Sequence, residues 1–307
     1  MAPSTAPAAR LSQAAFSPQL AAQANAPPAG PDWVHEIKVD GYRTFAFIRD
    51  GSVRLVTRGG HDWTHRYGDL GAQLASLPCN DAVIDGEIAV PDHDGVTRLS
   101  GLQAALTEGH TGSLVFHAFD LLRLNGADLR EHPLLQRKAA LASLVAALGP
   151  KADRVALCAV HRDGATLFRM ACERGMEGIV SKKVTEPYVG GRSRTWLKVK
   201  RQEHGQFRIA GFIANRPGYV SSVALMQTGE PDWRPICRAN VGSFGQALFD
   251  ALEPMTALPA PRGPRGYGKI RWIAPVWRAE VVYLGRTARG APRAPVLSGF
   301  ARDTVLQ

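Results

Sequence analysis

The sequence EIKVDGYR at residues 36–43 holds residue types that can do chemistry on a phosphate. Lys38 is followed by Asp40-Gly41 and then by Arg43, on a predicted strand that leads into a turn. This spacing can place an amine nucleophile beside a phosphate that a guanidinium holds. The same pattern also fits an exposed, solvated lysine on a hairpin, so the interpretation depends on the rest of the chain.

Five further segments follow this lysine in order. They are TRGGHDW (57–63), VIDGEIAV (83–90), HAFDLL (117–122), EGIVSKK (177–183) and WLKVK (196–200). Six elements in one order are hard to obtain by chance. Together they resemble the motif set of the covalent nucleotidyltransferases, which are DNA ligases, RNA ligases and mRNA capping enzymes. The similarity is strongest to the ATP-dependent ligase domain of bacterial end-joining DNA ligases, the ligase D and ligase C types, from about Phe16 to Asp303.

The resemblance implies a three-step reaction with ATP. Lys38 takes AMP, AMP passes to the 5′-phosphate of nicked or broken double-stranded DNA, and the 3′-hydroxyl displaces AMP to seal the strand. A free lysine has a pKa of about 10.4 and is protonated at neutral pH, so it needs cationic neighbours or desolvation to become a nucleophile. We expect Lys198 and Lys200 to supply that field and to contact the α-phosphate.

The resemblance also implies a divalent metal, Mg²⁺ or Mn²⁺, because phosphoryl transfer needs fixed positive charge. Glu177 matches the acidic position that binds the metal. Glu87 matches the position that contacts the ribose, with metal binding as its second candidate role. Either glutamate can instead be a partner in a structural ion pair.

The nucleotide contacts are implied in the same way. Phe119 matches the aromatic residue that stacks on adenine, although outside the motifs it would be assigned to the core. Glu36 matches the position near the adenine amino group, which favours ATP over GTP. Three arginines match positions that contact the ribose, the nick phosphate or the triphosphate: Arg43, Arg58 and Arg192.

The sequence departs from the family pattern near its end and in its second motif. Arg-Asn-Gly appears as Arg58-Gly59-Gly60, which keeps the arginine and a turn-permissive glycine. The final Arg-x-Asp-Lys falls on residues 301–304, Ala-Arg-Asp-Thr, so Arg302 is the candidate triphosphate contact, one position away. These changes predict that self-adenylation is weakened more than nick sealing.

The elements that position these residues predict an α+β fold. Residues 1–30 are rich in Ala and Pro and predict a flexible lead-in. Residues 31–202 predict an adenylation domain with antiparallel sheets, a hairpin turning at Asp50-Gly51, and helices at 133–148 and 163–174. The hairpin pattern begins at His35, breaks at Arg49-Asp50-Gly51-Ser52 and resumes to Gly60, so we expect Lys38 on a strand or at its end. Residues 203–307 predict a small β-barrel of the oligonucleotide-binding (OB) type.

Composition narrows the class of partner. Lys and Arg number 37 against 27 Asp and Glu, a net charge of +10, which favours a polyanion such as DNA. The four widely spaced cysteines exclude a CxxC zinc or redox site and predict buried free thiols. Neither a signal peptide nor a membrane span is evident, so we expect a protein of the bacterial cytoplasm. We also expect it to be a monomer. Ku and a separate polymerase or nuclease are candidate partners.

Two alternatives remain open from the sequence. An RNA ligase or capping-type nucleotidyltransferase would share Lys38 and the barrel. A catalytically weak nick-binding module would bind DNA without forming a lysyl-AMP adduct, and the altered last motif is compatible with that.

Overall fold

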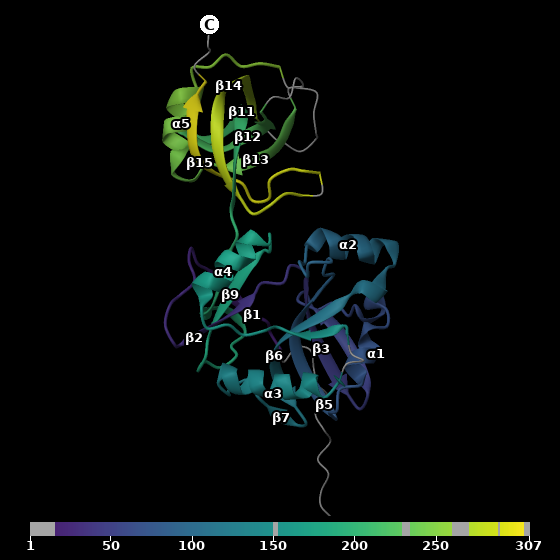
Figure 1. The fold of residues 1–307 in the computed structure, drawn as a ribbon. Helices are drawn as coiled ribbons and strands as arrows, with labels where there is room; N and C mark the ends of the chain where they lie inside the picture. The colour runs from purple at the N-terminus through teal and green to yellow at the C-terminus, as the bar shows by residue number, and fades with distance from the viewer. Residues whose placement is uncertain (1–15, 150–152, 229–233, 260–269, 288, 304–307) are drawn as a thin grey trace, which may run out of the picture. The chain divides into compact units, whose positions relative to one another are not determined.

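The chain folds into two compact units, Met1–Arg201 and Gln202–Gln307 (Figure 1). This computed structural model describes residues 16–149, 153–228, 234–259, 270–287 and 289–303. The division falls one residue before the predicted one. Thr304 of the last motif lies outside the described residues.

The larger sheet of the first unit contains six strands. Its order is β4 (Ser52–Thr57), β3 (Tyr42–Arg49), β5 (Asp81–Ala89), β6 (Val115–Leu124) and β7 (Ala127–Asp128), with β8 (Val155–Leu157) beside β6. The pairs are antiparallel except for β6 and β8. Asp50 and Gly51 both have positive φ, 46° and 76°, as a two-residue hairpin requires. The predicted turn is therefore confirmed.

A second sheet of four strands carries the first motif. Its order is β1 (Gln19–Gln23), β10 (Gly191–Lys200), β9 (Gly178–Lys183) and β2 (Trp33–Ile37), with β1 parallel to β10. The prediction of a flexible lead-in through residue 30 is wrong for β1. Its Ala-rich composition gave no periodic signal, and the strand is held by long-range partners instead.

Residues 38–41 cross from one sheet to the other, so the alternating pattern from His35 to Arg49 belongs to two strands, β2 and β3, in different sheets. Gly41 passes so close to β5 that a Cβ there would lie 2.1 Å from the carbonyl oxygen of Ile88. The Asp40 carboxylate accepts a hydrogen bond from the Leu99 amide at 3.0 Å, which ties the crossing to the start of a helix. Lys38 therefore lies just after β2, at the junction of the two sheets.

Helices cover the outer faces of both sheets (Figure 1). On the six-stranded sheet lie α1 (Leu70–Ala75), α2 (Leu99–Glu108) and α3 (Leu134–Ala146), and on the four-stranded sheet lies α4 (Gly164–Glu173). Short 3-10 helices span Thr64–Tyr67 and Thr111–Ser113. The predicted helices correspond to α3 and α4, and the Asp163 side chain caps α4 by accepting from the Thr166 amide.

The six-stranded sheet is buried on both faces. Ala46 and Ile48 of β3 pack with the helices, whereas Phe45 and Phe47 belong to a separate apolar cluster with Tyr188 and Trp196. This explains the almost continuous apolar run of β3, because a strand with two buried faces does not alternate. No helix within the described residues is long and apolar enough to cross a membrane.

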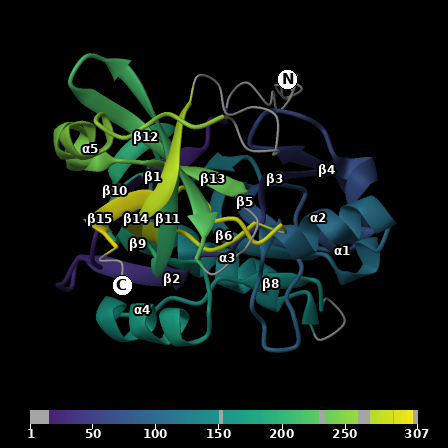
Figure 2. The same ribbon diagram turned by 90° about the horizontal axis from the view of Figure 1, so that it is seen from above.

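The second unit is a closed barrel of five strands. The order is β11 (Glu203–Arg216), β12 (Tyr219–Gln227), β13 (Pro235–Asn240), β15 (Val296–Arg302) and β14 (Arg271–Tyr283). A 3-10 helix, Gly242–Phe244, leads into α5 (Gly245–Leu252), which packs beside β12 (Figure 2). The sequence predicted a small β-barrel for residues 203–307, and the five strands close into a barrel. The four cysteines of the chain are free and partly buried.

Candidate active site

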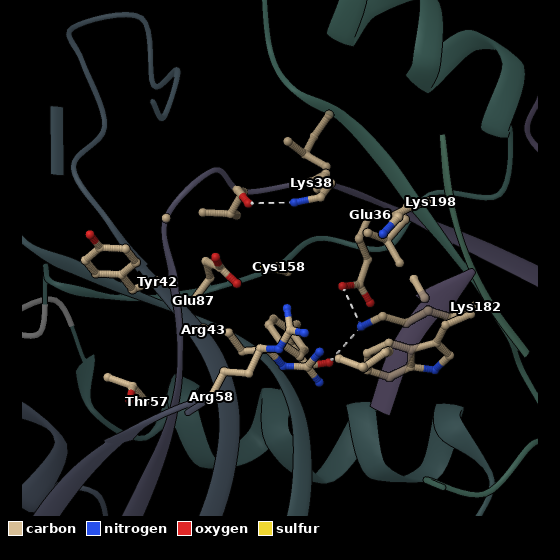
Figure 3. A pocket seen from close by; sticks show the side chains of 18 of the residues that line it. Glu36, Lys38, Tyr42, Arg43, Thr57, Arg58, Glu87, Cys158, Lys182 and Lys198 are labelled. Carbon is tan, nitrogen blue, oxygen red and sulfur yellow. Dashed lines mark hydrogen bonds and ion pairs between the residues drawn. The ribbon is translucent and has the colours of Figure 1, made fainter. Parts of the chain in front are cut away.

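A cavity of about 530 Å³ in the first unit is lined by residues of both sheets (Figure 3). It brings together most of the predicted site residues: Glu36, Lys38, Arg43, Arg58, Glu87, Phe119, Arg192, Lys198 and Lys200. These come from β2, β3, β5, β6, β10 and the turn after β4, which are far apart in the sequence. Glu177 precedes β9 and reaches two of the lining lysines.

Lys38 and Lys200 share the carboxylate of Glu177. The Lys38 Nζ lies 2.5 Å from Oε2 of Glu177, and the Lys200 Nζ lies 2.6 Å from Oε1. Lys38 remains 22% exposed, so it is accessible from the cavity despite this contact. We name these residues, together with the neighbouring Lys198, the lysine cluster.

The pKa of Lys38 is set by burial and by the neighbouring carboxylates. Burial disfavours the ammonium of Lys38, but the carboxylates of Glu177 and Glu87 outweigh burial, so the pKa of Lys38 is raised. Burial likewise opposes the Glu177 carboxylate, but Lys38 and Lys200 overcome this and lower its pKa. The predicted activation of Lys38 by its lysine neighbours is therefore outweighed in this arrangement. Burial, followed by repulsion from Lys200 and Lys38, lowers the pKa of Lys198.

Glu87 has a raised pKa and lacks a hydrogen-bond partner among the described residues. Burial raises its pKa to about 7, with Lys38 and Arg43 only partly offsetting the effect. Glu87 is partly buried and lines the cavity, so its carboxylate can receive a cation or a hydroxyl from the cavity.

Glu36 belongs to a buried cluster with two lysines, Lys138 and Lys182. The Nζ atom of Lys138 lies 2.8 Å from one Glu36 oxygen and that of Lys182 lies 2.9 Å from the other, and Glu36 is 2% exposed. Figure 3 shows Lys182 beside Glu36. Burial opposes the carboxylate, but Lys182 and Lys138 overcome it and lower the pKa of Glu36. Glu36 is therefore an ionised hydrogen-bond acceptor in the cavity wall. We name these three residues the Glu36 cluster.

The aromatic side of the cavity is flanked by cations. Phe119 and Trp196 stand edge to face with ring centroids 6.0 Å apart. The Lys182 Nζ lies 4.6 Å from the Phe119 centroid and 4.2 Å from the Trp196 centroid. The Arg43 guanidinium lies 5.1 Å from the Phe119 centroid. These contacts stabilise the cations within the wall.

The three predicted arginines differ in their contacts. Arg43 forms a bidentate pair with the buried Asp85, at 2.9 Å from Nε and 2.5 Å from Nη2. Arg58 and Arg192 line the cavity, are exposed, and have no acidic partner among the described residues. They are therefore available to a polyanionic ligand, whereas most of the Arg43 donors are already used.

Sequence reasoning missed two residues that line the cavity, Lys182 and Trp196. It also missed four residues that bond to lining residues, namely Gln19, Asp85, Lys138 and Tyr188. One signal was available for Lys138. Arg137 and Lys138 fall between Leu134 and Leu141, on the buried face of α3. A charged residue at such a position indicates a buried ion pair.

Arg302 lies on β15 of the barrel, where it is exposed and pairs across the strands with Trp277. Asp303 contacts Arg208 of β11 at 2.6 Å, so this part of the last motif has a bonding role within the barrel. Arg302 itself has no ion-pair partner among the described residues.

The mixed α+β fold and the lysine-lined cavity define a nucleotidyltransferase-type ligase domain. Residues 18–200 match the family model of the ATP dependent DNA ligase domain. The match covers more than half of the chain, and the chain belongs to this family.

The relatives agree with this assignment. The chain is 33% identical over 301 residues to the multifunctional non-homologous end joining protein LigD of Pseudomonas aeruginosa, covering 94% of this chain and 36% of that protein. It is 32% identical over 244 residues to a probable DNA ligase of Rhodococcus opacus, covering 77% of this chain and 47% of that protein. The chain thus spans about a third to a half of these relatives.

Solved structures show the same fold. The ligase domain of LigD from M. tuberculosis is 28% identical, with a TM-score of 0.59 and coverage of 95% of this chain and 96% of that chain. A mycobacterial DNA ligase D complexed with ATP and MES gives a TM-score of 0.58 at the same identity, covering 95% and 97%.

Proposed function

We propose that this chain seals breaks in DNA through an AMP adduct on Lys38. The observation that carries the proposal is the position of Lys38 beside Glu177, inside a cavity whose accessible arginines, Arg58 and Arg192, have no acidic partner in the part of the chain that the structure describes. An amine, an acidic group that controls its charge and unpaired guanidiniums are the parts needed for transfer of a nucleotide from a triphosphate.

The proposed reaction has three displacements. The Lys38 Nζ attacks the α-phosphorus of ATP, an N–P bond forms, and the bond to the bridging oxygen breaks as pyrophosphate leaves. A 5′-phosphate oxygen of DNA then displaces Lys38, which recovers its electron pair. Finally the 3′-hydroxyl attacks the DNA phosphorus and AMP leaves. The first step requires loss of a proton from Lys38, and neutralising Glu177 favours it because that carboxylate raises the pKa of Lys38.

We propose Glu87 and Glu177 as ligands of a divalent metal, with Glu177 released from Lys38 and Lys200 when the metal binds. Both offer carboxylate oxygens, the ligands that Mg²⁺ prefers, and Glu87 is a partly buried carboxylate without a bonded partner among the described residues. Mg²⁺ or Mn²⁺ bound there would neutralise charge on the triphosphate. We also propose Glu87 as a contact of the ribose.

We assign Glu36 and Phe119 to the adenine. An ionised carboxylate accepts hydrogen bonds only, so it favours the amino group of adenine over the carbonyl of guanine. Lys198 and Lys200 are proposed to contact the α-phosphate. The ribose and the other phosphates are proposed to be bound by three arginines, Arg43, Arg58 and Arg192.

DNA is proposed to contact the barrel, which we interpret as an OB-fold. Arg208 and Arg271 are paired with Asp303 and Glu253, whereas Arg238 has no acidic partner among the described residues. Arg238 lines a hollow of about 450 Å³ with polar, uncharged neighbours: Asn215, Ser221, Ser222 and Asn240. An unpaired guanidinium among amides and hydroxyls suits a phosphodiester backbone.

A matched pair of variants tests the barrel contact. Arg238→Ala should weaken binding to nicked duplex at all sequences and lower the salt slope of log Kd by about 1. Arg271→Ala removes a charge already neutralised by Glu253 and should leave the slope unchanged. Equal slopes for Arg238→Ala and the wild type would contradict the assignment.

The pathway is proposed from the relatives, which carry end-joining names. We propose that this domain joins broken ends in cooperation with a Ku-type end-binding protein and a polymerase or nuclease. Stimulation of end joining by the purified Ku protein, compared with sealing of a simple nick, measures this directly.

One experiment tests the central proposal. After incubation with ATP and Mg²⁺, intact mass should show one added AMP, and the adduct should be consumed by nicked DNA. Labelling by GTP in place of ATP would indicate a capping-type enzyme, and transfer to nicked RNA alone would indicate an RNA ligase. Binding of nicked DNA without any adduct would leave only a nick-binding module.

A further inference from the structure

The strand β1 belongs to the wall of the cavity. Leu20 and Ala21 line the cavity beside the predicted site residues. The strand runs parallel to β10, and the Ala24 amide donates to the carbonyl oxygen of Lys198 at 3.0 Å. A segment whose composition predicted a loose lead-in is therefore bonded to the strand that carries two of the cavity lysines.

Gln19 is the anchor of this strand. It is 0% exposed, and each of its polar groups has a partner. Its amide donates to the Tyr188 hydroxyl at 2.9 Å, and its side-chain Nε2 donates to the Thr195 hydroxyl at 2.8 Å. Its Oε1 accepts from the Val189 amide at 2.9 Å. A fully buried glutamine is unusual, and complete bonding fixes its main chain in one position.

The main-chain carbonyl of Gln19 contacts Arg43. It accepts a hydrogen bond from Nη1 of Arg43 at 2.5 Å. Nε and Nη2 of Arg43 are bonded to Asp85, and Nη2 also lies 3.3 Å from the Tyr188 hydroxyl. A guanidinium has five N–H donors. The second hydrogen of Nη1 is the donor left without a bonded partner among the described residues.

We infer that Gln19 is a positioning residue of the nucleotide site, which fixes the direction of the last free donor of Arg43. Because a guanidinium is planar, holding Nε, Nη2 and one hydrogen of Nη1 determines where the remaining hydrogen lies. Arg43 lines the cavity, so this donor is available to the ribose or a phosphate of bound ATP. The inference rests on the proposed function of the cavity.

Gln19→Met tests the inference, because methionine has nearly the same length but neither amide group. Self-adenylation at saturating ATP should slow by about 10- to 100-fold, the size expected when a contact group is misplaced. The matched control is Gln23→Met on the same strand. The Gln23 side chain is exposed and donates a hydrogen bond to the carbonyl oxygen of its neighbour Ala24. It should change the rate by less than about twofold.

A double-mutant cycle separates positioning from general stability. If Gln19 acts through Arg43, adding Gln19→Met to an Arg43→Lys protein should cost less than about twofold further. Rates are expressed per folded protein, measured by circular dichroism. Thr195→Val removes one partner of Gln19 and should give a smaller loss of the same kind, which carries the test if Gln19→Met does not fold.

The outcomes separate this inference from the proposed function. A wild-type protein that never forms an AMP adduct would overturn the function itself. A wild-type protein that adenylates normally, with Gln19→Met or Thr195→Val equally active, would overturn only the role of Gln19. Fully additive losses in the cycle would show that Gln19 stabilises the sheet without orienting Arg43.

Discussion

Two groups of charges in the first unit differ in how completely they are paired. Around α3, Arg137 and Asp120 are both 0% exposed and bonded twice, at 2.8 and 2.9 Å. In the cavity, Glu87 has no bonded partner among the described residues, and Lys38 keeps 22% exposure. A buried charge that is fully paired cannot bind anything else without losing its partner. The comparison teaches that the structural pair beside α3 is both fully paired and fully buried, whereas Glu87 and Lys38 each lack at least one of these properties.

The largest expected effect concerns Lys38. Lys38→Ala should abolish the AMP adduct, a loss of at least about 10⁴-fold, because no other group replaces a covalent nucleophile. Lys38→Arg should also fail, since a guanidinium stays protonated. Intact mass after incubation with ATP measures the adduct, and circular dichroism checks the fold. Lys183→Ala, outside the cavity lining, serves as the matched control. An adduct on Lys38→Ala would remove Lys38 from the chemistry.

The next largest effect should be on stability. Arg137→Met leaves Asp120 buried and unpaired, so the free energy of unfolding should fall by about 3–5 kcal/mol. Arg54→Met is the control, because Arg54 and Asp62 form an exposed pair, 53% and 42% accessible, where less than about 1 kcal/mol is expected. Urea denaturation of both variants gives the two values. Similar losses would show that pairing at 0% exposure has no special weight here.

Glu87 gives a pH-dependent effect of intermediate size. Its pKa is raised from 4.5 to about 7, so the wild type loses stability as pH rises between these values. Glu87→Gln cannot ionise, so its unfolding midpoint should match the wild type below about pH 4.5. Above pH 7 it should be more stable, by about 3 kcal/mol at most. Thermal scans at pH 4.5 and pH 8 measure the difference, and a constant gap at both pH values would mean that Glu87 does not titrate as described.

Glu87 should also affect how the metal requirement of adenylation depends on pH. If its carboxylate binds metal, the metal concentration needed for half-maximal adenylation should fall as pH rises through about 7. Glu87→Gln should lose that dependence. A pH profile unchanged by the substitution would assign Glu87 to the ribose alone.

The smallest effect in this series concerns Arg302, an exposed arginine without an ion-pair partner among the described residues. If it contacts the triphosphate, Arg302→Ala should slow self-adenylation by about 10- to 150-fold and leave sealing of a pre-adenylated nick nearly unchanged. Arg271→Ala, whose charge is paired on the same barrel, is the control. Equal loss of both activities would make Arg302 a DNA contact or a part of the fold.

Local features of this protein were determined by the sequence alone. The turn at Asp50-Gly51, the cap at Asp163 and the extent of α3 each depend on a few neighbouring residues, so local patterns predict them. The ordered motifs likewise identified residues that meet in one cavity. Strand β1 escaped prediction because its stability comes from Tyr188, Thr195 and Arg43, far along the chain.

The tertiary structure alone decided which charges are paired. Glu36 lies 102 residues from Lys138 and 146 from Lys182, and Lys38 lies 139 from Glu177. The sequence predicted that Lys198 and Lys200 would activate Lys38, yet the neighbouring carboxylates, Glu177 first among them, raise the pKa of Lys38. The electrostatic energy of two charges depends on their separation and burial. Both quantities are set only when distant segments fold together. The sequence could therefore indicate which residues belong to the site, but not which of them carry a charge.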